Sequence, residues 1–248
     1  FDLVGRENAA GRELKVLVAG CMPARYGDDL AAELVEAAGF LAADDEDNVV
    51  EEVTRLLDGD VSLVRADRSL IRHAYPTSAY VKISDGCDRF CSYCMIPYIR
   101  GRYRSYPLSR IDDEVAELVC NGVREIVLIG QDTGIWGHDL EEPSTTATLV
   151  RTLAHRYPDT WFRLLYVQPE GIDDELLDVI ATYPNVCPYL DMPLQHVNAE
   201  VLAHMNRSGN AKDILALLDH VRDRVPDIKI RTTLMAGFPG ETEEQFEE

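Results

Sequence analysis

Residues 82–103 read KISDGCDRFCSYCMIPYIRGRY. The segment Tyr80–Ser84, which leads into this stretch, predicts a β-strand. Three cysteines follow it, at Cys87, Cys91 and Cys94, with three residues between the first two and two between the last two. In parallel α/β folds, the loops that follow the strands form the active face. We therefore expect the three thiols to lie at a functional pocket.

This cysteine spacing suits a metal centre in a reducing, cytoplasmic compartment better than a disulfide framework. An iron–sulfur cube has four irons, so three local thiolates would leave one iron open for a ligand that is not protein. A closed zinc site needs a fourth protein ligand, and the loop contains no further Cys or His. Two alternatives stay open: a zinc ribbon completed by a distant Cys120 or histidine, and three separate buried thiols.

The chain after residue 79 alternates predicted strands with helical stretches. Helices are indicated over Ser109–Asn121, with Ser109 as the cap, after the cap Asp173, and after a capping box of Thr242 and Gln245. The strands that follow the first are predicted over Glu125–Gly130, Phe162–Val167, Val186–Met192 and Lys229–Ala236. Five βα repeats predict an α/β fold, either a barrel or an open parallel sheet.

A separate α/β unit is predicted before this repeat. Its strands and helices are expected over Leu14–Gly20, Asp28–Gly39, Phe40–Ala43 and Asp44–Leu57. We expect residues 1–57 to be the C-terminal part of a doubly wound α/β domain whose first strands lie upstream. Residues 58–78 are predicted to be a linker, and residues 79–248 a partial barrel truncated after its fifth strand.

Composition excludes several classes of protein. The chain has 248 residues, of which 46% are hydrophobic and 27% charged, so it is neither disordered nor collagen-like. Its longest apolar runs, such as residues 16–19 and 126–129, are far shorter than the roughly 18 residues that a membrane helix needs. The first residues show no secretory signal. These features predict a cytoplasmic protein that does not span a membrane.

Charge is distributed unevenly along the chain. Acidic residues number 44 against 24 basic ones, and the net charge of −20 repels nucleic acid at long range. The excess favours a protein or small-molecule partner, or simply keeps the protein soluble. Residues 82–110 differ, because six basic residues stand there against two acidic ones. This basic island suits contacts with an anionic ligand, or solvated arginines in a loop.

The pattern Cys87-x3-Cys91-x-Tyr93-Cys94 resembles the signature of the radical S-adenosylmethionine (SAM) enzymes. The resemblance implies that the three cysteines hold a 4Fe-4S cluster, whose fourth iron binds the amino and carboxylate groups of SAM, and that Tyr93 packs near the adenine. It also implies an electron donor of the flavodoxin or ferredoxin type. A reduced cluster can pass one electron to the sulfonium and produce a 5′-deoxyadenosyl radical.

Five further segments are similar to the methylthiotransferases: Tyr80–Cys87, Pro97–Ser105, Gly130–Thr133, Asp191–His196 and Gly237–Thr242. Within that family, MPLQH at 192–196 and RLLY at 163–166 resemble the ribosomal-protein (RimO-like) branch more than the tRNA branch. The resemblance implies a partial TIM-like radical SAM barrel. It also implies an enzyme that adds a methylthio group to the β-carbon of an aspartate in a small-subunit ribosomal protein. One SAM would donate the methyl group, and a second would form the radical.

The family resemblance also implies a second 4Fe-4S cluster, which supplies or carries the sulfur. Cys21 would be the last of its three ligands, with the other two upstream. The residue type alone would make Cys21 a small buried hydrophobe at a strand end. Cys120 and Cys187 are expected in the core, and His196, beside the expected pocket, needs no role.

Besides Tyr93, SAM contacts are expected at five positions. Superfamily members hold the methionine amine after the second strand, where this chain has Gly-Gln-Asp in place of the usual Gly-Gly-Glu, so Gln131 and Asp132 are the candidates. Gln195 would reach the ribose. Met235 would lie against the adenine, or pack in the core. Arg207, on the helix after the fourth strand, is a candidate for the SAM carboxylate, or an exposed arginine at a helix end.

Two other functions stay open from the sequence. The same chemistry on an adenosine of tRNA differs only in substrate, and the acidic charge weighs mildly against it. The other is an iron–sulfur or zinc module without catalysis, which would not cleave SAM. An unactivated C–H bond has no acidic proton, so no acid–base pair is nominated.

Overall fold

The computed structural model describes Gly11 and residues 14–57 and 77–248. Almost all of the linker predicted over residues 58–78 lies outside the described residues, and the predicted division into domains stays a prediction. Within the described ranges, no helix is both long and apolar enough to cross a membrane. The chain divides into two compact units.

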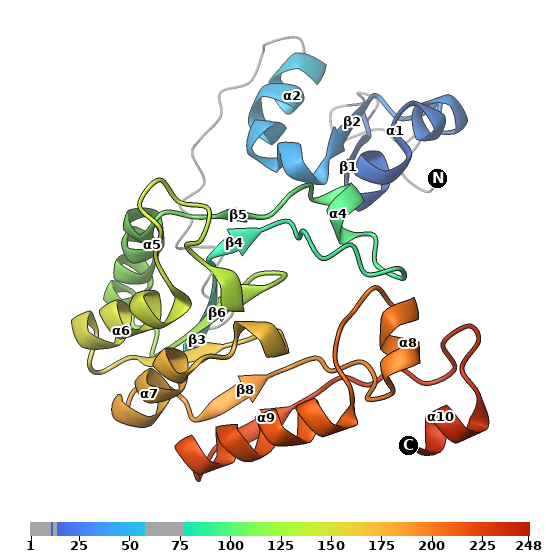
Figure 1. Ribbon diagram of the computed structural model, residues 1–248. Coiled ribbons are helices and arrows are strands. Elements are labelled where there is room, and N and C mark those ends of the chain that lie inside the picture. Colours follow the sequence, from blue (N-terminus) through green and yellow to red (C-terminus); the bar gives the residue numbers. More distant parts are fainter. Residues whose placement is uncertain (1–10, 12–13, 58–76) are drawn as a thin grey trace. The chain divides into compact units, whose positions relative to one another are not determined.

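The first unit consists of Phe1–Ala66 and Met95–Gly101. Strands β1 and β2 pair in parallel, with Leu17 opposite Gly39, and α1 connects them (Figure 1). The described elements of the unit are β1 (Leu17–Gly20), α1 (Cys21–Glu33), β2 (Gly39–Ala42), the 3-10 helix η1 (Ala43–Asn48), α2 (Val49–Leu56) and α4 (Ile96–Ile99). This strand–helix–strand order is the one that the sequence predicts for a doubly wound fold.

Helix α1 begins earlier than the sequence predicts. Its first residue is Cys21, directly after β1, whereas the sequence places the start at Asp28. The backbone leaves the helical region at Gly27, where φ is 49°, so α1 consists of two helical segments joined at a kink. Pro23 lies in the first turn, where its missing N–H breaks no helical hydrogen bond. The predicted start at Asp28 therefore marks the second segment.

The second unit consists of Asp67–Cys94 and Arg102–Glu248. Its strands are β3 (Ser78–Lys82), β4 (Ser84–Asp85), β5 (Arg104–Ser105), β6 (Glu125–Ile129), β7 (Trp161–Leu164), β8 (Tyr189–Asp191) and β9 (Lys229–Arg231). Its helices are α5 (Leu108–Cys120), η2 (Thr133–Ile135), α6 (Thr146–Arg156), η3 (Pro169–Gly171), α7 (Asp174–Thr182), α8 (Ala199–His204), α9 (Ala211–Arg224) and α10 (Glu243–Glu247).

The long strands of this unit run in parallel and in chain order. Strands β3, β6 and β7 form one sheet, in which Tyr80 lies opposite Val127 and Val127 opposite Arg163. Strand β8 pairs with β9, and an isolated parallel bridge between Phe162 and Val186 joins the two sheets. Consecutive parallel strands connected by helices form the arc of a (β/α) barrel, so the predicted partial TIM-like fold is confirmed.

The core of the second unit lies between these strands and the helices α5, α6, α7 and α9 on their outer side (Figure 1). Helix α5 shows the pattern: Ile111, Val115 and Leu118 recur every three or four residues and are all buried. They pack in one cluster with strand residues that include Ile126 and Leu128. Burial of one such side chain stabilises the fold by roughly 1.5–3 kcal/mol.

Two strands are shorter than predicted, because the apolar run in the sequence is longer than the segment that pairs with a neighbouring strand. The run over Val186–Met192 yields only Tyr189–Asp191 as strand β8. The run over Lys229–Ala236 yields only Lys229–Arg231, followed by a single bridge between Gln195 and Leu234. Met235 therefore lies in a loop rather than on a strand.

Helix caps are predicted more accurately than strand ends. Asp173 Oδ1 accepts from Leu176 N at 2.8 Å, and the capping box of Thr242 and Gln245 is formed. The cap predicted at Ser109 is wrong, because α5 begins one residue earlier, at Leu108. Its capping position is Pro107, which has no side-chain hydrogen bond to offer.

Cys187 is buried as expected, but Cys120 is exposed. The buried stripe of α5 passes through Val115 and Leu118, and Cys120 comes two residues after Leu118. Residues two apart on a helix do not share a face, so Cys120 points away from the core.

Candidate functional site

The cysteine loop follows the short strand β4. Asp85 Oδ1 accepts from Gly86 N at 3.0 Å, and Gly86 turns the chain with φ of 74°, a conformation that favours glycine. Cys87 is buried, whereas Cys91 and Cys94 are half-buried. Cys94 N donates to Cys91 O at 2.9 Å and closes a tight turn between the last two thiols. All three therefore belong to one loop at the carboxyl end of a strand, as predicted.

The three cysteines of the loop carry free thiols. All six cysteines, each in the described part of the chain, are free thiols. Among the described residues, no group of three or more His, Cys, Asp or Glu side chains could hold a metal ion as placed. Burial raises the pKa of the Cys87 thiol, and a backbone hydrogen bond from Arg89 opposes this rise. Burial thus disfavours the thiolate form of Cys87.

A buried ion pair anchors the side chain at the middle of the loop. Arg89 Nε lies 2.6 Å from Asp132 Oδ2, and its Nη1 lies 2.9 Å from Glu170 Oε2. Asp132 follows β6, and Glu170 lies in η3, after β7. The loops after β4, β6 and β7 are thus connected by one guanidinium group.

The backbone of the loop is held by the loop after α8. Asn206 Nδ2 donates to Arg89 O at 3.1 Å and to Phe90 O at 3.0 Å. Ser92 N donates to Met205 O at 3.1 Å. Phe90 has φ of 48°, in the left-handed region, so these contacts hold it in an unfavourable conformation.

Two unpartnered oxygens lie at the carboxyl end of β6. Asp132 is fully buried, and its Oδ1 atom has no hydrogen-bond partner within the described ranges; nor has Gln131 Oε1. Burial raises the pKa of Asp132, while the Arg89 guanidinium and a weaker backbone hydrogen bond from Gly134 to the carboxylate oppose that rise. A buried acceptor without a donor is costly, by about 1–3 kcal/mol, unless a ligand supplies the donor. This pair of oxygens suits a cationic or N–H-bearing ligand.

Arg207 and Tyr93 lie near each other. Arg207 Nη2 donates to Gln168 Oε1 at 2.6 Å and to Pro193 O at 2.9 Å. Burial raises the pKa of the Tyr93 hydroxyl, and Arg207 is among the neighbours that oppose the rise. The sequence placed Arg207 on a helix, but α8 ends at His204. Arg207 is half-buried in the following loop, so it is not an exposed arginine at a helix end.

Gln195 and Met235 form a second group. Gln195 N donates to Thr233 O at 2.8 Å, and Met235 N donates to Gln195 O at 2.7 Å. Both residues line a cavity of about 270 Å³, together with His196 and Phe246. Met235 is half-buried and lies outside the core clusters, so its side chain faces this cavity rather than the core.

His196 also has a place in the structure, although the sequence gives it no role. Its Nδ1 atom accepts from Asn198 N at 2.9 Å, and its Nε2 atom lies 3.2 Å from Glu241 Oε1. The Oε2 atom of Glu241 accepts from Phe238 N at 2.8 Å. These bonds connect the loop after β8 to the loop after β9.

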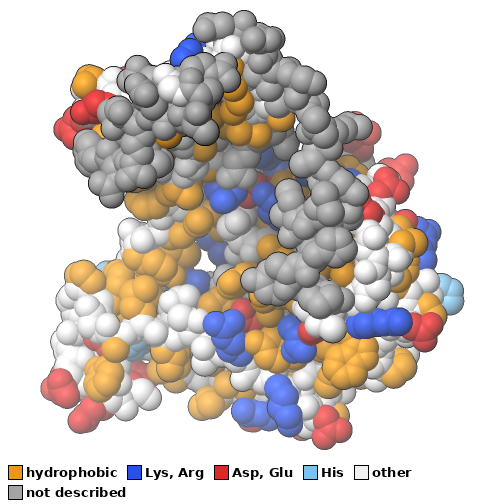
Figure 2. Space-filling view, turned by 180° about the vertical axis from the view of Figure 1, so that it is seen from behind, with side chains coloured by type: hydrophobic (Ala, Val, Ile, Leu, Met, Phe, Trp, Pro, Cys, Tyr) orange, Lys and Arg blue, Asp and Glu red, His pale blue; other side chains and the backbone are white. Residues whose placement is uncertain are grey.

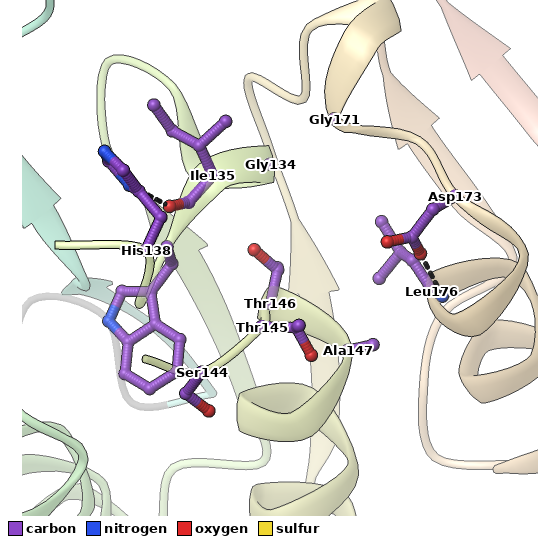
Figure 3. Close-up of a pocket in the computed structure, with 11 residues that line it drawn as sticks. Gly134, Ile135, His138, Ser144, Thr145, Thr146, Ala147, Gly171, Asp173 and Leu176 are labelled. Atoms are coloured by element: carbon purple, nitrogen blue, oxygen red, sulfur yellow. Dashed lines mark hydrogen bonds between the residues drawn. The ribbon is translucent and has the colours of Figure 1, made fainter. Parts of the chain in front are cut away.

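A separate cavity of about 350 Å³ lies between η2 and the first turns of α6 and α7, and Figure 3 shows its lining. Thr145 and Asp173, which cap the two helices, face it. None of the candidate cofactor residues lines it. Gly134 and Gly171 meet at its edge so closely that a Cβ on Gly171 would lie 2.7 Å from Gly134 Cα. The η2 and η3 segments are therefore in backbone contact.

The basic island predicted over residues 82–110 is partly neutralised by its own acids. Lys82 Nζ lies 3.0 Å from Asp85 Oδ2, and Arg102 Nε lies 3.1 Å from Asp88 Oδ1. Figure 2 shows Lys and Arg side chains interspersed with hydrophobic and acidic ones on the face it displays. These ion pairs, together with the burial of Arg89 against Asp132, argue against one continuous anion-binding patch in this segment.

A family model matches most of the second unit of the chain. The model of the radical SAM superfamily matches residues 81–248, which include the cysteine loop and every strand from β6 to β9. The chain belongs to the radical SAM superfamily. The resemblance of the Cys87–Cys94 spacing to that superfamily is thereby confirmed.

Several curated relatives of this radical SAM protein are ribosomal protein uS12 methylthiotransferases (RimO). The chain is 42% identical to that of Syntrophus aciditrophicus over 96% of this chain and 55% of the relative. It is 42% identical to that of Geobacter sulfurreducens over 99% and 57%, and 43% identical to that of Symbiobacterium thermophilum over 96% and 50%. The chain thus spans about half the length of the curated relatives it matches.

Solved radical SAM structures share the fold. The cobalamin-dependent SAM radical enzyme OxsB matches with a TM-score of 0.64 at 10% identity, over 88% of this chain and 36% of that one. The radical SAM methyltransferase TsrM from Kitasatospora setae matches with a TM-score of 0.57 at 22% identity, over 71% and 34%. At these identities the likeness concerns the fold alone.

The cofactors of a radical SAM protein are a 4Fe-4S cluster and SAM, and the residues present fit both. The loop offers three free thiols, a donor set that suits iron–sulfur ligation. The unpartnered oxygens of Gln131 and Asp132 suit an ammonium group.

Three residues of this site were missed by sequence reasoning. Arg89, Glu170 and Asn206 hold the cysteine loop through contacts that span 43 to 117 positions in the chain. Only Arg89 carried a signal, because it stands between two of the cysteines. The partners of long-range polar contacts are not encoded in any local pattern.

Proposed function

We propose that this protein is a methylthiotransferase that adds a methylthio group to the β-carbon of an aspartate in ribosomal protein uS12. The observation that carries the proposal is the identity of about 42% with uS12 methylthiotransferases over almost the whole chain. The structure supports the proposal with three free thiols in one loop, and with an unpartnered carboxylate oxygen in the neighbouring loop.

Cys87, Cys91 and Cys94 would hold the cluster that binds SAM. When bound, the cluster supplies the electron that breaks a carbon–sulfur bond of SAM. Cys21 would be one ligand of a second cluster. It is exposed at the first residue of α1, directly after β1, which leaves its thiol accessible to a metal centre.

The side chains after β6 would bind the methionine end of SAM. Asp132 Oδ1 and Gln131 Oε1 would accept from its ammonium group, since both atoms are buried acceptors without a donor among the described residues. Arg207 would lie near the SAM carboxylate. Its Nη2 atom is already bonded to Gln168 and Pro193, so the remaining N–H groups of the guanidinium would make this contact.

The other end of SAM would lie between the loops after β8 and β9. Gln195 and Met235 line a common cavity there, which Phe246 makes partly apolar. An amide and a thioether beside an apolar wall suit a ribose and an adenine ring. Tyr93, in the cysteine loop, would pack near the adenine.

The remaining task of the chain is to exclude water and to orient the substrate. The β-hydrogen of an aspartate is not acidic enough for a side-chain base to remove it, so the reaction requires a radical. No acid–base pair is therefore assigned. We place the reaction in the cytoplasm, where ribosomal protein uS12 and a donor of the flavodoxin or ferredoxin type would meet the enzyme.

The direct test is anaerobic reconstitution with iron and sulfide, followed by reduction with dithionite in the presence of SAM. The proposal expects 5′-deoxyadenosine, and a methylthio adduct on an aspartate of uS12 detected by mass spectrometry. Formation of the adduct on an adenosine of tRNA instead would assign the other branch. A protein that binds iron or zinc without producing 5′-deoxyadenosine would refute the enzymatic function.

A further inference from the structure

Arg89 contacts two carboxylates from two different loops. It stands between Cys87 and Cys91, and its Nε and Nη1 atoms reach Asp132 at 2.6 Å and Glu170 at 2.9 Å. The three groups come from the loops that follow β4, β6 and β7. One cation therefore connects the loop that carries the cysteines with the loop that carries the unpartnered carboxylate oxygen.

Burial makes this contact different from a surface ion pair. The side chain of Asp132 is 0% exposed and that of Arg89 is 24% exposed, whereas Glu170 is 45% exposed. A carboxylate withdrawn from water needs a compensating charge, and Arg89 is the cation that the structure places on it. Glu170 keeps contact with solvent and makes the weaker contribution.

The ion pair with Arg89 also fixes the orientation of the Asp132 carboxylate. A carboxylate is planar, so holding Oδ2 determines where Oδ1 points. Arg89 binds only Oδ2, and Oδ1 has no partner within the described part of the chain. The backbone of Arg89 is held as well, because its carbonyl accepts from Asn206 Nδ2 at 3.1 Å. Both ends of Arg89 are thus fixed.

We propose that Arg89 is the positioning residue of this site. It directs Asp132 Oδ1 towards the ammonium group of SAM and, through the same ion pair, holds the cysteine loop against that carboxylate. This inference rests on the proposed function, because it takes SAM as the ligand. It adds a residue whose side chain contacts neither the cluster nor SAM but determines whether both are held in one arrangement.

The test compares Arg89→Ala and Arg89→Lys with the matched control Arg102→Ala. Arg102 pairs with Asp88 and lies over the Phe90 ring, but its side chain is 72% exposed and contacts neither Asp132 nor Glu170, so its loss should leave iron content and SAM affinity unchanged. Each reconstituted variant is assayed for iron content, for SAM affinity by equilibrium dialysis, and for the change in the electron paramagnetic resonance spectrum of the reduced cluster on addition of SAM. Hydrogen exchange over residues 86–94 is measured in the metal-free protein.

We expect Arg89→Ala to retain its iron but to bind SAM about tenfold or more weakly, as the loss of a charge-assisted hydrogen bond predicts. Its spectral change should be reduced, and exchange in the metal-free loop should be faster. Arg89→Lys should restore part of the affinity, because an ammonium can reach one carboxylate but not both. Asp132→Asn should weaken SAM binding to a similar degree.

Unchanged SAM affinity in Arg89→Ala would overturn the inference, and so would unchanged affinity in Asp132→Asn. Equal loss of iron in Arg89→Ala and Arg89→Lys would also overturn it, because Arg89 would then only maintain the fold of the loop. Failure of the proposed function looks different: the unmodified protein would itself show no spectral response to SAM and no 5′-deoxyadenosine.

Discussion

Gly130 offers a sharp test of the packing behind the candidate SAM site. A Cβ at this position would lie 2.4 Å from Ser84 Oγ, 3.4 Å from Thr133 Cγ2 and 3.5 Å from Ser84 O. Non-bonded heavy atoms normally stay about 3.5 Å apart, so the Ser84 oxygen would have to retreat by about 1 Å. Ser84 is fully buried, so its hydroxyl has little space to rotate into.

We expect Gly130→Ala to lower the free energy of unfolding by about 1–2 kcal/mol. Overpacking of a filled site costs about 1–3 kcal/mol, and the reduced entropy of the unfolded chain returns about 0.4–1 kcal/mol. In a Ser84→Ala background the obstructing oxygen is absent. There, Gly130→Ala should be neutral or slightly stabilising relative to Ser84→Ala alone.

Urea unfolding followed by tryptophan fluorescence measures this directly. The two tryptophans of the chain, Trp136 and Trp161, both lie in the second unit, so the signal reports on the unit that contains Gly130. The displacement also reaches Asp132, two residues on, so SAM affinity should fall in Gly130→Ala and recover in the double variant. Equal stability of Gly130→Ala and the unmodified protein would refute the packing argument, as would a double variant no better than Gly130→Ala.

Three other predictions follow from the structure. Asn185→Ala should lower the free energy of unfolding by about 2–3 kcal/mol in urea titrations, because Asn185 Nδ2 donates to three backbone carbonyls at 3.0–3.2 Å; a change under about 0.5 kcal/mol would contradict this. Burial raises the pKa of Asp139, but hydrogen bonds from Ser105 outweigh it and hold that pKa below its usual range. The stabilisation is therefore present above the unfolded pKa and lost as pH falls through the folded one, so Asp139→Asn should be less acid-sensitive in thermal melts at decreasing pH. Cys94→Ala should lose the iron of this loop after reconstitution, whereas the buried Cys187→Ala should keep it; equal iron contents would rule out the assignment.

The sequence predicted the order and type of the barrel elements because each strand is a short apolar run and the helices carry local caps. Asp173 and Thr242 act as predicted. The strands predicted over Val186–Met192 and Lys229–Ala236 are longer than the observed ones. Hydrophobicity indicates which residues are buried, whereas a strand also requires a neighbouring strand to pair with.

The candidate site was predicted in part. The cysteine spacing located the loop, and the position after β6 located Asp132, since both depend on short-range order. The ion pair between Arg89 and Asp132 joins residues 43 positions apart, and the bond from Asn206 to Arg89 joins residues 117 apart. Such partners depend on how the loops fold over the strand ends, which no local pattern specifies.

The contact between Gly134 and Gly171 has a mechanical consequence for the site. Each glycine lies just beyond a carboxylate that binds Arg89, and an added Cβ on either glycine would lie 2.7–2.9 Å from the Cα of the other, so the two segments are in direct backbone contact. Asp132 and Glu170 therefore lie on two segments that should move together. A substitution that displaces one of these segments should displace the other, so that both carboxylate oxygens that bind Arg89 would change position together.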